Sequence, residues 1–361
     1  MQALILVGGH GTRLQPVTLT LPKPVIPLVD RPFIRYMIDW LARHGVDDIV
    51  MACGFLPDGI RAVLGDGLAG GPRLRYVEEP EPRGTAGAIK FAAELLDDRF
   101  LALNGDVLMD LDLTALMEQH QASGARATLA LHPVADPTGY GLVRRAPDGE
   151  VLEFLEKPDP ADIDTDEVSA GAYVLEKEVL DLVPEGQDVS IEREVFPRLV
   201  GDGLNSRRLE GYWMDIGTPE RYLGACWDIL CGNVESEPGS RADGEGRHVA
   251  EGAAVEEGAT VRGPAFVDAD ASVAGGATIG PRAVLGAGVE VGEGATVEGS
   301  ALHPACRIGA GASVRGAILA AGVVVEDGAE VPEGAVIGAG ARITASAGLE
   351  PGARVQPEET A

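Results

Sequence analysis

Short apolar runs alternate with stretches of helical periodicity over residues 1–230. Ala3–Val7 is continuously apolar and ends in glycines, as a buried parallel strand does. Apolar positions in Phe33–His44 recur with helical spacing, and the pattern closes at Gly45. The same reading predicts further strands at Asp48–Cys53, Phe100–Leu103 and Ala127–His132, and helices at Gly87–Leu96 and Leu111–Ser123. This alternation predicts an α/β fold, a Rossmann-like domain with a mostly parallel sheet covered by helices.

A different pattern begins after the polar, glycine-rich and acidic segment Glu235–Gly246. From Val249 to Val355 an aliphatic residue recurs every six positions, with Gly, Ala, Ser and Thr between, and the phase slips near His303. A six-residue period predicts a left-handed parallel β-helix, in which the aliphatic side chains point inward. We therefore expect an α/β domain at 1–232, a linker at 233–246 and a β-helix at 247–361.

Composition and charge limit the possible partners. A chain of 361 residues with a net charge of −28 is expected to bind neither nucleic acid nor an anionic membrane, because both would be repelled. No apolar run approaches the roughly 20 residues needed to span a bilayer. The start of the chain lacks the features of a signal peptide, and the four cysteines show no metal-ligand spacing. A cytoplasmic location is the expectation.

A glycine-rich loop follows the first strand. Glycines at 8, 9 and 11 let backbone N–H groups approach phosphate oxygens, and Arg13 adds a charged fork suited to phosphate. Lys23 follows between two prolines as a point charge on stiff backbone. The loop is neither a Walker P-loop nor a complete dinucleotide fingerprint. By itself it predicts phosphate binding, with an ordinary strand-end turn as the alternative.

The run LVGGHGTRLQPVT and the later LPKP resemble the signature of the sugar-1-phosphate nucleotidylyltransferases. Further matches follow in family order: GTAGAI at 84–89, NGD at 104–106, EKP at 156–158, SAG at 169–171 and WMDIGTPERY at 213–222. The stretches VSIEREVFPRL and LEGYWMDIGTP are most similar to mannose-1-phosphate guanylyltransferases. The resemblance implies that a sugar 1-phosphate attacks the α-phosphorus of an NTP and that pyrophosphate leaves.

The resemblance also implies roles for individual residues. Arg13, Lys23, Asp106 and Asp215 would be catalytic, with Asp106 and Asp215 as ligands of Mg²⁺. The nucleotide would be bound by Leu6, Gly8, Gly9, Gly11, Thr12, Arg13, Lys23, Glu81, Gly84, Asn104, Gly105 and Asp106. The sugar phosphate would be bound by Gly141, Glu156, Lys157, Ser169 and Gly171.

The choice of base and sugar rests on fewer residues. Guanine presents adjacent donors that suit a carboxylate, and the segment before GTAG resembles EEEPLGTAG, so Glu81 is the candidate guanine reader; a solvated acidic loop is the alternative. Gln15 stands where an arginine is common, and Ser169 stands where the family usually has an Asn. GTP and mannose 1-phosphate are the expected substrates, and dTTP with glucose 1-phosphate is the alternative.

Two other classes remain open at this point. Hexapeptide β-helices also occur in acyltransferases, and His303 lies at a phase slip where a catalytic loop could insert. A non-catalytic regulatory homologue is the second, although such proteins lose the catalytic arginine, lysines or aspartates that this chain keeps. The open last coil and the flat faces of the β-helix are unpaired edges, so we expect a homo-oligomer formed through this domain.

Overall fold

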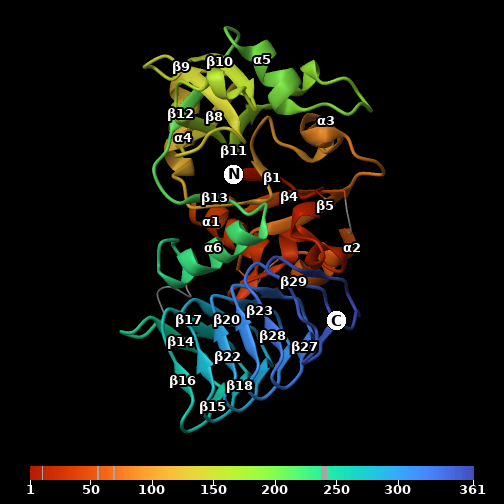
Figure 1. Ribbon diagram of the computed structural model, residues 1–361. Helices are drawn as coiled ribbons and strands as arrows, with labels where there is room; N and C mark the ends of the chain where they lie inside the picture. The colour runs from red at the N-terminus through yellow and green to blue at the C-terminus, as the bar shows by residue number, and fades with distance from the viewer. Residues whose placement is uncertain (10, 55–56, 68–69, 237–241) are drawn as a thin grey trace. The chain divides into compact units, whose positions relative to one another are not determined.

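The computed structural model describes residues 1–9, 11–54, 57–67, 70–236 and 242–361. The chain forms two compact units. Unit 1 comprises Met1–Gly9 and Met37–Trp213, and unit 2 comprises His10–Tyr36 and Met214–Ala361 (Figure 1). His10 lies outside the described residues, as does 237–241 within the expected linker.

Unit 1 is built on a mixed sheet with the strand order β10-β9-β11-β6-β1-β4-β5, joined by β8 and β12 through β11. β6, β1, β4 and β5 run parallel, while β11 joins β6 antiparallel. Apart from β2 and β3, the strands up to β13 have these bounds: β1 (Gln2–Leu6), β4 (Asp48–Cys53), β5 (Arg73–Glu78), β6 (Arg99–Asn104), β7 (Val107–Met109), β8 (Ala127–Pro133), β9 (Gly141–Arg145), β10 (Val151–Glu156), β11 (Glu167–Glu176), β12 (Leu204–Arg208) and β13 (Trp213–Asp215), which begins in unit 1 and ends in unit 2. The predicted Rossmann-like sheet is confirmed.

The centre of this sheet is apolar on both faces. β1 pairs in register with β4 and β6, so that Leu4 lies beside Val50 and Ala102. These side chains are fully buried and belong to one cluster with Ile89 and Phe196. Strands buried on both faces explain why the sequence shows continuous apolar runs here rather than alternation.

The helices follow the predicted order but differ at their ends. Their bounds are α1 (Phe33–Arg43), α2 (Pro57–Leu64), α3 (Gly84–Phe91), α4 (Leu113–Ser123), α5 (Phe196–Leu199) and α6 (Pro219–Leu230). The helix expected from Gly87 begins three residues earlier, because the Ala86 and Gly87 N–H groups donate to the Val189 carbonyl. α4 begins later than expected, where the Asp112 carboxylate accepts the Ala115 N–H at 3.0 Å.

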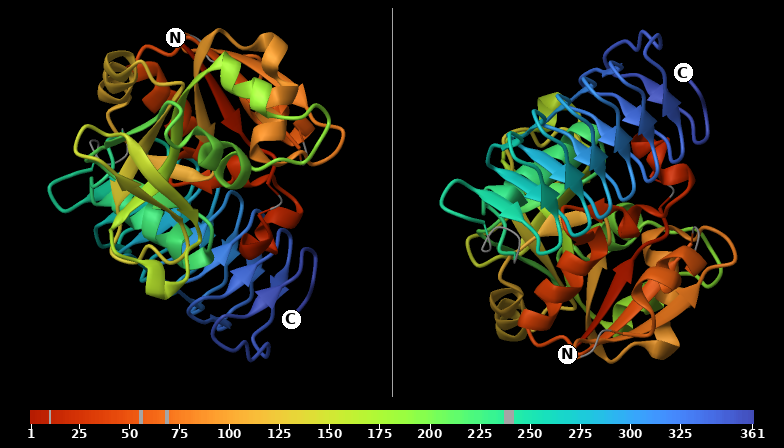
Figure 2. Two further views of the ribbon diagram at one scale, coloured as in Figure 1. Left: turned by 90° about the horizontal axis from the view of Figure 1, so that it is seen from above. Right: turned by 90° about the horizontal axis from the view of Figure 1, so that it is seen from below.

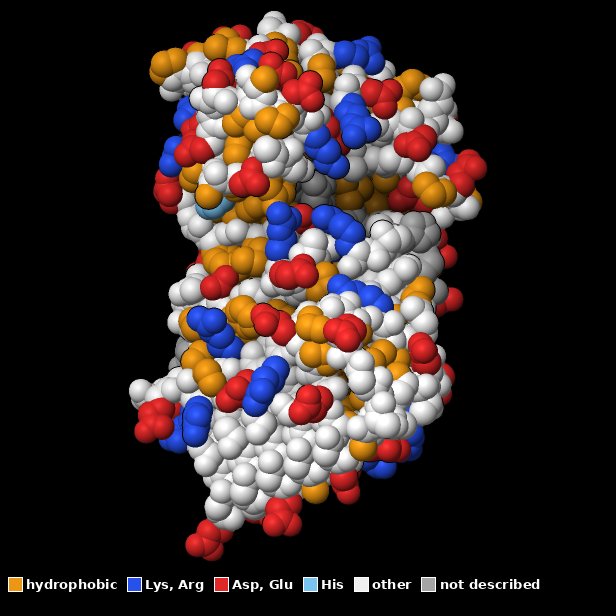
Figure 3. All heavy atoms as spheres, viewed as in Figure 1, with side chains coloured by type: hydrophobic (Ala, Val, Ile, Leu, Met, Phe, Trp, Pro, Cys, Tyr) orange, Lys and Arg blue, Asp and Glu red, His pale blue; other side chains and the backbone are white. Residues whose placement is uncertain are grey.

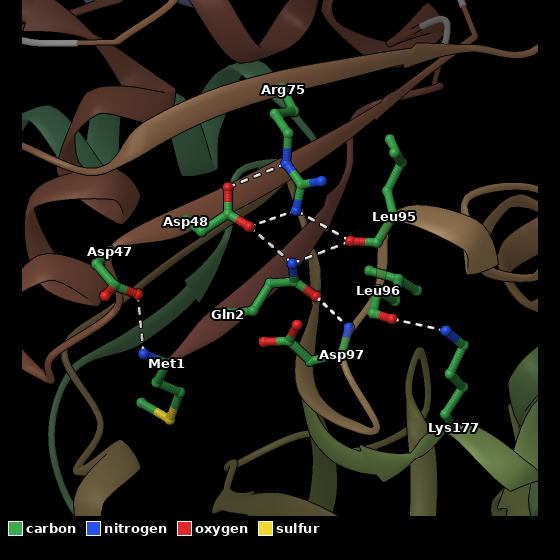
Figure 4. A network of polar contacts seen from close by, with 9 residues as sticks. All are labelled: Met1, Gln2, Asp47, Asp48, Arg75, Leu95, Leu96, Asp97 and Lys177. Carbon is green, nitrogen blue, oxygen red and sulfur yellow. Dashed lines mark hydrogen bonds and ion pairs between the residues drawn. The ribbon is translucent and has the colours of Figure 1, made fainter.

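The amino ends of the central strands are joined by a polar network (Figure 4). Gln2 donates to Asp48 at 2.7 Å and to the Leu95 carbonyl at 3.0 Å, and it accepts the Asp97 N–H at 2.7 Å. Arg75 forms an ion pair with Asp48 and donates to the same Leu95 carbonyl. These bonds satisfy the polar groups at the amino ends of the strands. The loops that carry the candidate site residues follow the opposite, carboxyl ends.

Unit 2 contains the β-helix. Its strands stack in three sheets, all parallel, with one strand per sheet in most coils of residues 247–361, all of which are described (Figure 2). The first sheet contains β14 (Arg247–Val249), β17 (Ala265–Val267), β20 (Ala283–Leu285), β23 (Ala301–Leu302), β26 (Ile318–Leu319), β29 (Val336–Ile337) and β31 (Arg354–Val355). The second contains β15 (Ala254–Val255), β18 (Ser272–Val273), β21 (Glu290–Val291), β24 (Arg307–Ile308), β27 (Val324–Val325) and β30 (Arg342–Ile343). The third contains β16 (Thr260–Val261), β19 (Thr278–Ile279), β22 (Thr296–Glu298), β25 (Ser313–Arg315) and β28 (Glu330–Val331).

The hexapeptide period is the origin of this stacking. The recurring aliphatic positions from Val267 to Val355 lie in one buried cluster, so the predicted left-handed parallel β-helix is confirmed in its three-sheet arrangement. The face of the β-helix that Figure 3 shows is largely backbone and small side chains, with scattered charged side chains. The first coil differs: Val249 aligns with Val267 of the next coil and Val255 with Val273, but the two side chains are 44% and 39% exposed.

Unit 2 also holds a hairpin of β2 (Pro27–Leu28) and β3 (Arg31–Pro32) together with α6. The Tyr222 hydroxyl on α6 donates to the Pro27 carbonyl and lies 3.0 Å from Nε2 of His303. Complete burial lowers the pKa of His303 to about 4, so the ring is neutral near pH 7. No helix of the described residues is long and apolar enough to cross a membrane.

Burial of His303 makes the stability of the fold depend on pH. Its folded-state pKa lies below the usual unfolded value near 6.5, so its neutral form favours the fold above pH 6.5 and this contribution is lost as pH falls towards 4. We expect His303→Gln, which keeps a donor towards Tyr222, to flatten the pH dependence of the free energy of unfolding by up to about 3 kcal/mol across this window. Urea unfolding of both proteins at pH 7 and pH 4.5 measures this, and parallel losses in the two proteins would contradict it.

Candidate active site

The carboxyl end of β1 lies directly beside the end of β6. The Gly105 N–H donates to the Leu6 carbonyl at 2.9 Å, and a Cβ at position 105 would meet that oxygen at 2.5 Å. Only glycine therefore allows this approach. Asn104 and the half-buried Asp106 flank Gly105, so unit 1 places them beside the start of the Gly8–Gly9 loop.

Gly171 of β11 lies against Asn104, next to the same contact. Its φ is +74°, and a Cβ there would lie 2.9 Å from Nδ2 of Asn104. β11 also shifts register against β8 between Ser169 and Tyr173. Unit 1 thus brings together the predicted residues Gly8, Asn104, Gly105 and Gly171.

A second group of predicted residues meets at the ends of β9 and β10. Gly141 pairs with Glu156, and a Cβ at Gly141 would meet the Glu156 carboxylate at 3.0 Å. Burial raises the pKa of the Glu156 carboxyl, and the charge of Glu192 adds to this. Lys157 follows with a φ of +51°, and its N–H donates to the Tyr140 carbonyl at 3.1 Å. β10 therefore ends at Glu156, and the Lys157 side chain is exposed.

Two glutamates, Glu81 and Glu79, are candidates for the carboxylate that binds the guanine base. The Glu81 side chain is 71% exposed, with Arg83 at 4.0 Å. Glu79 is half-buried, and its carboxylate lies 3.8 Å from the position of a Cβ on Gly8. Burial raises the pKa of the Glu79 carboxyl, which nearby Arg83 opposes. The sequence pattern alone gave no reason to prefer Glu79, since both residues belong to the same acidic segment.

Gly84 marks the start of α3. Its φ is +67°, and a Cβ there would meet the Asp188 carboxylate at 2.5 Å and the Val189 carbonyl at 2.6 Å. The segment before the π-helical turn at Ile191–Val195 therefore lies against the GTAG motif. This contact links two motifs that are about a hundred residues apart in the chain.

Unit 2 carries the remaining predicted catalytic residues. Gly11 has a φ of +60°, and its carbonyl accepts the Thr18 hydroxyl at 2.9 Å. A Cβ on Gly11 would meet the stem of the buried Lys23 at 3.2 Å, so the loop lies against that lysine. Thr12 and Arg13 follow in a 3₁₀ turn and are exposed.

Asp215 lies near two arginine side chains. Its side chain is 16% exposed, with Arg221 at 2.9 Å and Arg13 at 3.9 Å. Arg13 can approach Asp215 because position 217 is a glycine: a Cβ there would meet the Arg13 guanidinium at 2.4 Å. Arg221 was not among the predicted residues; its place six positions after Asp215, in the same motif, was the available signal.

The two aspartates are suitable in type for Mg²⁺. This ion is usually held by one or two carboxylates and completes its shell with water and substrate phosphates. Asp106 and Asp215 provide such oxygens, and the described residues contain no group of three or more His, Cys, Asp or Glu placed to hold a metal. Each aspartate by itself has the donor chemistry that suits an ion which also binds triphosphate oxygens.

Comparison with known proteins supports these features. The family model for nucleotidyl transferase matches residues 2–230, and the model for the GMPPB C-terminal domain matches 261–358. The chain therefore belongs to the nucleotidyl transferase family, as the motif resemblance indicated.

Named relatives refine this placement. The mannose-1-phosphate guanylyltransferase of Mycobacterium tuberculosis is 39% identical over 240 residues, which are 65% of this chain and 66% of the relative. The mannose-1-phosphate guanyltransferase of Schizosaccharomyces pombe is 41% identical over 234 residues, 63% of this chain and 64% of the relative. The matched region thus spans just under two thirds of these relatives.

A solved structure also matches. HddC from Yersinia pseudotuberculosis superimposes with a TM-score of 0.55 and 28% identity, covering 63% of this chain and 99% of HddC. HddC complexed with GMP-PN matches with the same TM-score and 27% identity.

Proposed function

We propose that the chain transfers the GMP group of GTP to mannose 1-phosphate, giving GDP-mannose and pyrophosphate. The observation that carries this is the meeting of the β1 glycine loop, Asp106 and Gly171 at one edge of the unit 1 sheet. In open α/β sheets ligands bind beyond the carboxyl ends of the strands. The named relatives support the choice of GTP and mannose 1-phosphate.

In this reaction an ionised oxygen of the sugar phosphate forms a bond to the α-phosphorus, and the bond from that phosphorus to the leaving pyrophosphate breaks. The attacking oxygen is already charged, so no general base is required. Catalysis then rests on alignment and on neutralising charge. We assign the triphosphate to Gly8, Gly9, Gly11 and Thr12, with Arg13 and Lys23 as its cations. Lys157 would hold the sugar phosphate, and Glu156, Gly141, Ser169 and Gly171 would surround the hexose.

Mg²⁺, held by Asp106 and Asp215, would supply further charge neutralisation on the phosphates when bound. Leu6, Gly84, Asn104 and Gly105 would shape the nucleotide site. We also propose that residues 1–232 form the catalytic domain, 233–246 a linker and 247–361 the β-helix domain, which the two family matches support. The use of nucleotides and sugar phosphates supports a cytoplasmic location, which cell fractionation would test.

Activity is the first test. We expect pyrophosphate release in Mg²⁺ with GTP and mannose 1-phosphate, exceeding every other pair in a screen of NTPs against hexose 1-phosphates. Arg13→Ala and Asp106→Asn should each lower kcat/KM by about 100-fold or more, since each removes charge stabilisation from the transition state. Arg315→Ala and Asp202→Asn, both exposed ion-pair members, are the matched controls.

The screen also separates the other functions. No activity with any pair would favour a non-catalytic homologue, and a preference for dTTP with glucose 1-phosphate would favour a thymidylyltransferase. Acetyl transfer from acetyl-CoA would favour the acyltransferase. The burial of His303 against Tyr222 already argues against that ring as an acyltransferase base.

The base preference distinguishes Glu79 from Glu81. A carboxylate that reads guanine accepts from its two adjacent donors, so its replacement by Gln should lower kcat/KM for GTP about 10- to 100-fold. We expect Glu79→Gln to show this loss and Glu81→Gln to match the wild type, because Glu79 is the half-buried carboxylate beside Gly8. A loss confined to Glu81→Gln would reinstate the expectation from the sequence.

We also propose that the chain forms a homo-oligomer through the first coil of the β-helix. Among the described residues β14, β15 and β16 each pair on one side, and Val249 and Val255 are exposed beside those free edges. Light scattering should give a mass that is a multiple of 37.5 kDa. Val249→Asp combined with Val255→Asp should lower it, while Leu152→Asp, at a site 57% exposed on β10, should not. A wild-type monomer would disprove this assembly.

A further inference from the structure

Glu192 lies in a π-helical turn, Ile191–Val195, which packs against β10 and α3 (elements labelled in Figure 1). π-helical turns are rare in proteins, and those that do occur often lie at functional sites. The Glu192 side chain is half-buried, whereas the neighbouring Arg193 and Glu194 are exposed. The turn therefore directs one carboxylate inward.

Three hydroxyl groups from different parts of the fold hold this carboxylate. Thr85 donates to Oε2 at 2.8 Å and Ser190 donates to the same oxygen at 2.9 Å. The Tyr173 hydroxyl lies 3.4 Å from Oε1. An ionised carboxylate has about four acceptor positions, so these three bonds leave room for one more donor on the Oε1 side.

The surroundings of Oε1 are those of the proposed sugar subsite. The charge of Glu192 helps to raise the pKa of Glu156, second to burial, which places the two carboxylates within electrostatic reach of one another. The Ser169 hydroxyl lies 3.5 Å from the Tyr173 hydroxyl, at the position where the family usually carries an Asn. Glu156, Glu192 and Ser169 are each half-buried, so two carboxylates and one hydroxyl offer acceptors to a ligand that brings several hydroxyl donors.

We propose that Glu192 is a specificity-determining residue that accepts a hydrogen bond from a ring hydroxyl of the hexose, opposite Glu156. This inference rests on the proposed function. A carboxylate fixed by Thr85, Ser190 and Tyr173 presents its free acceptor position in one direction only. A hexose whose hydroxyl points elsewhere leaves that position unpaired in a half-buried site, and such sites discriminate strongly between substrates.

Glu192→Gln tests the proposal while sparing the fold. The amide oxygen can accept from Thr85 and Ser190, and the amide nitrogen can donate to Tyr173, whose hydroxyl is also an acceptor. The variant therefore keeps the contacts within the protein and loses the charge and the free acceptor. Glu194→Gln is the matched control, since Glu194 is exposed on the same turn and accepts the Ser190 N–H at 2.9 Å.

We expect Glu192→Gln to lower kcat/KM for mannose 1-phosphate about 10- to 100-fold and to reduce the preference for mannose 1-phosphate over glucose 1-phosphate. The KM for GTP and the melting temperature should stay at the wild-type values, and Glu194→Gln should match the wild type throughout. A Glu192→Gln variant with equal losses for both sugars, or with an unchanged sugar preference, would overturn the proposal. An inactive wild type would instead defeat the proposed function, and calorimetric binding of mannose 1-phosphate to both proteins then still tests Glu192.

The pH dependence of kcat/KM for mannose 1-phosphate is a measurement that a purely structural role of Glu192 would leave unchanged. The charges that act on Glu156 are those of Glu192 and Arg193 from the π-helical turn and of the adjacent Lys157. Removing the charge of Glu192 removes one influence that raises the pKa of Glu156. The acidic limb of kcat/KM for mannose 1-phosphate should therefore move to lower pH in Glu192→Gln, and an unmoved limb would count against the shared subsite.

Discussion

The close approach of β6 to β1 at Gly105 is the contact on which the rest of unit 1 depends. The Gly105 N–H donates to the Leu6 carbonyl, and any side chain at 105 would collide with that oxygen. This contact fixes Asn104 and Asp106 at the edge where β1 delivers its glycine loop. Gly171 then closes over Asn104 from β11. One backbone contact thus places the glycine loop after β1, the Asp106 carboxylate and β11 at the same edge.

A chain with a net charge of −28 must concentrate its few cations to bind anionic substrates. Its four lysines divide into two roles. Lys90 and Lys177 donate to the Leu180 and Leu96 carbonyls and stabilise the fold. Lys23 is buried beneath Gly11, and Lys157 is set by a left-handed backbone. The lysines in the family motifs, Lys23 and Lys157, are the two to which we assign the anionic groups of the substrates.

Local patterns in the sequence predicted most of the fold. The strand Asp48–Cys53 and the inward column of the β-helix follow from continuous apolar runs and a fixed period. The start of α3 was predicted at Gly87 instead of Gly84, because a distant carbonyl sets it. The stretch VSIEREVFPRL was recognised, but the proposed role of Glu192 within it was not predicted, because Thr85 and Tyr173, which hold its carboxylate, lie in other segments of the chain.

A crystal structure with Mg²⁺, a non-hydrolysable GTP analogue and mannose 1-phosphate tests the central claim most directly, because that claim is the convergence of one site at the carboxyl ends of β1, β6, β10 and β11. We expect the triphosphate on the glycine loop near Asp106, guanine at Glu79, and the hexose between Glu156 and Glu192. A nucleotide bound away from the β1 loop, or a hexose out of reach of both glutamates, would contradict the account.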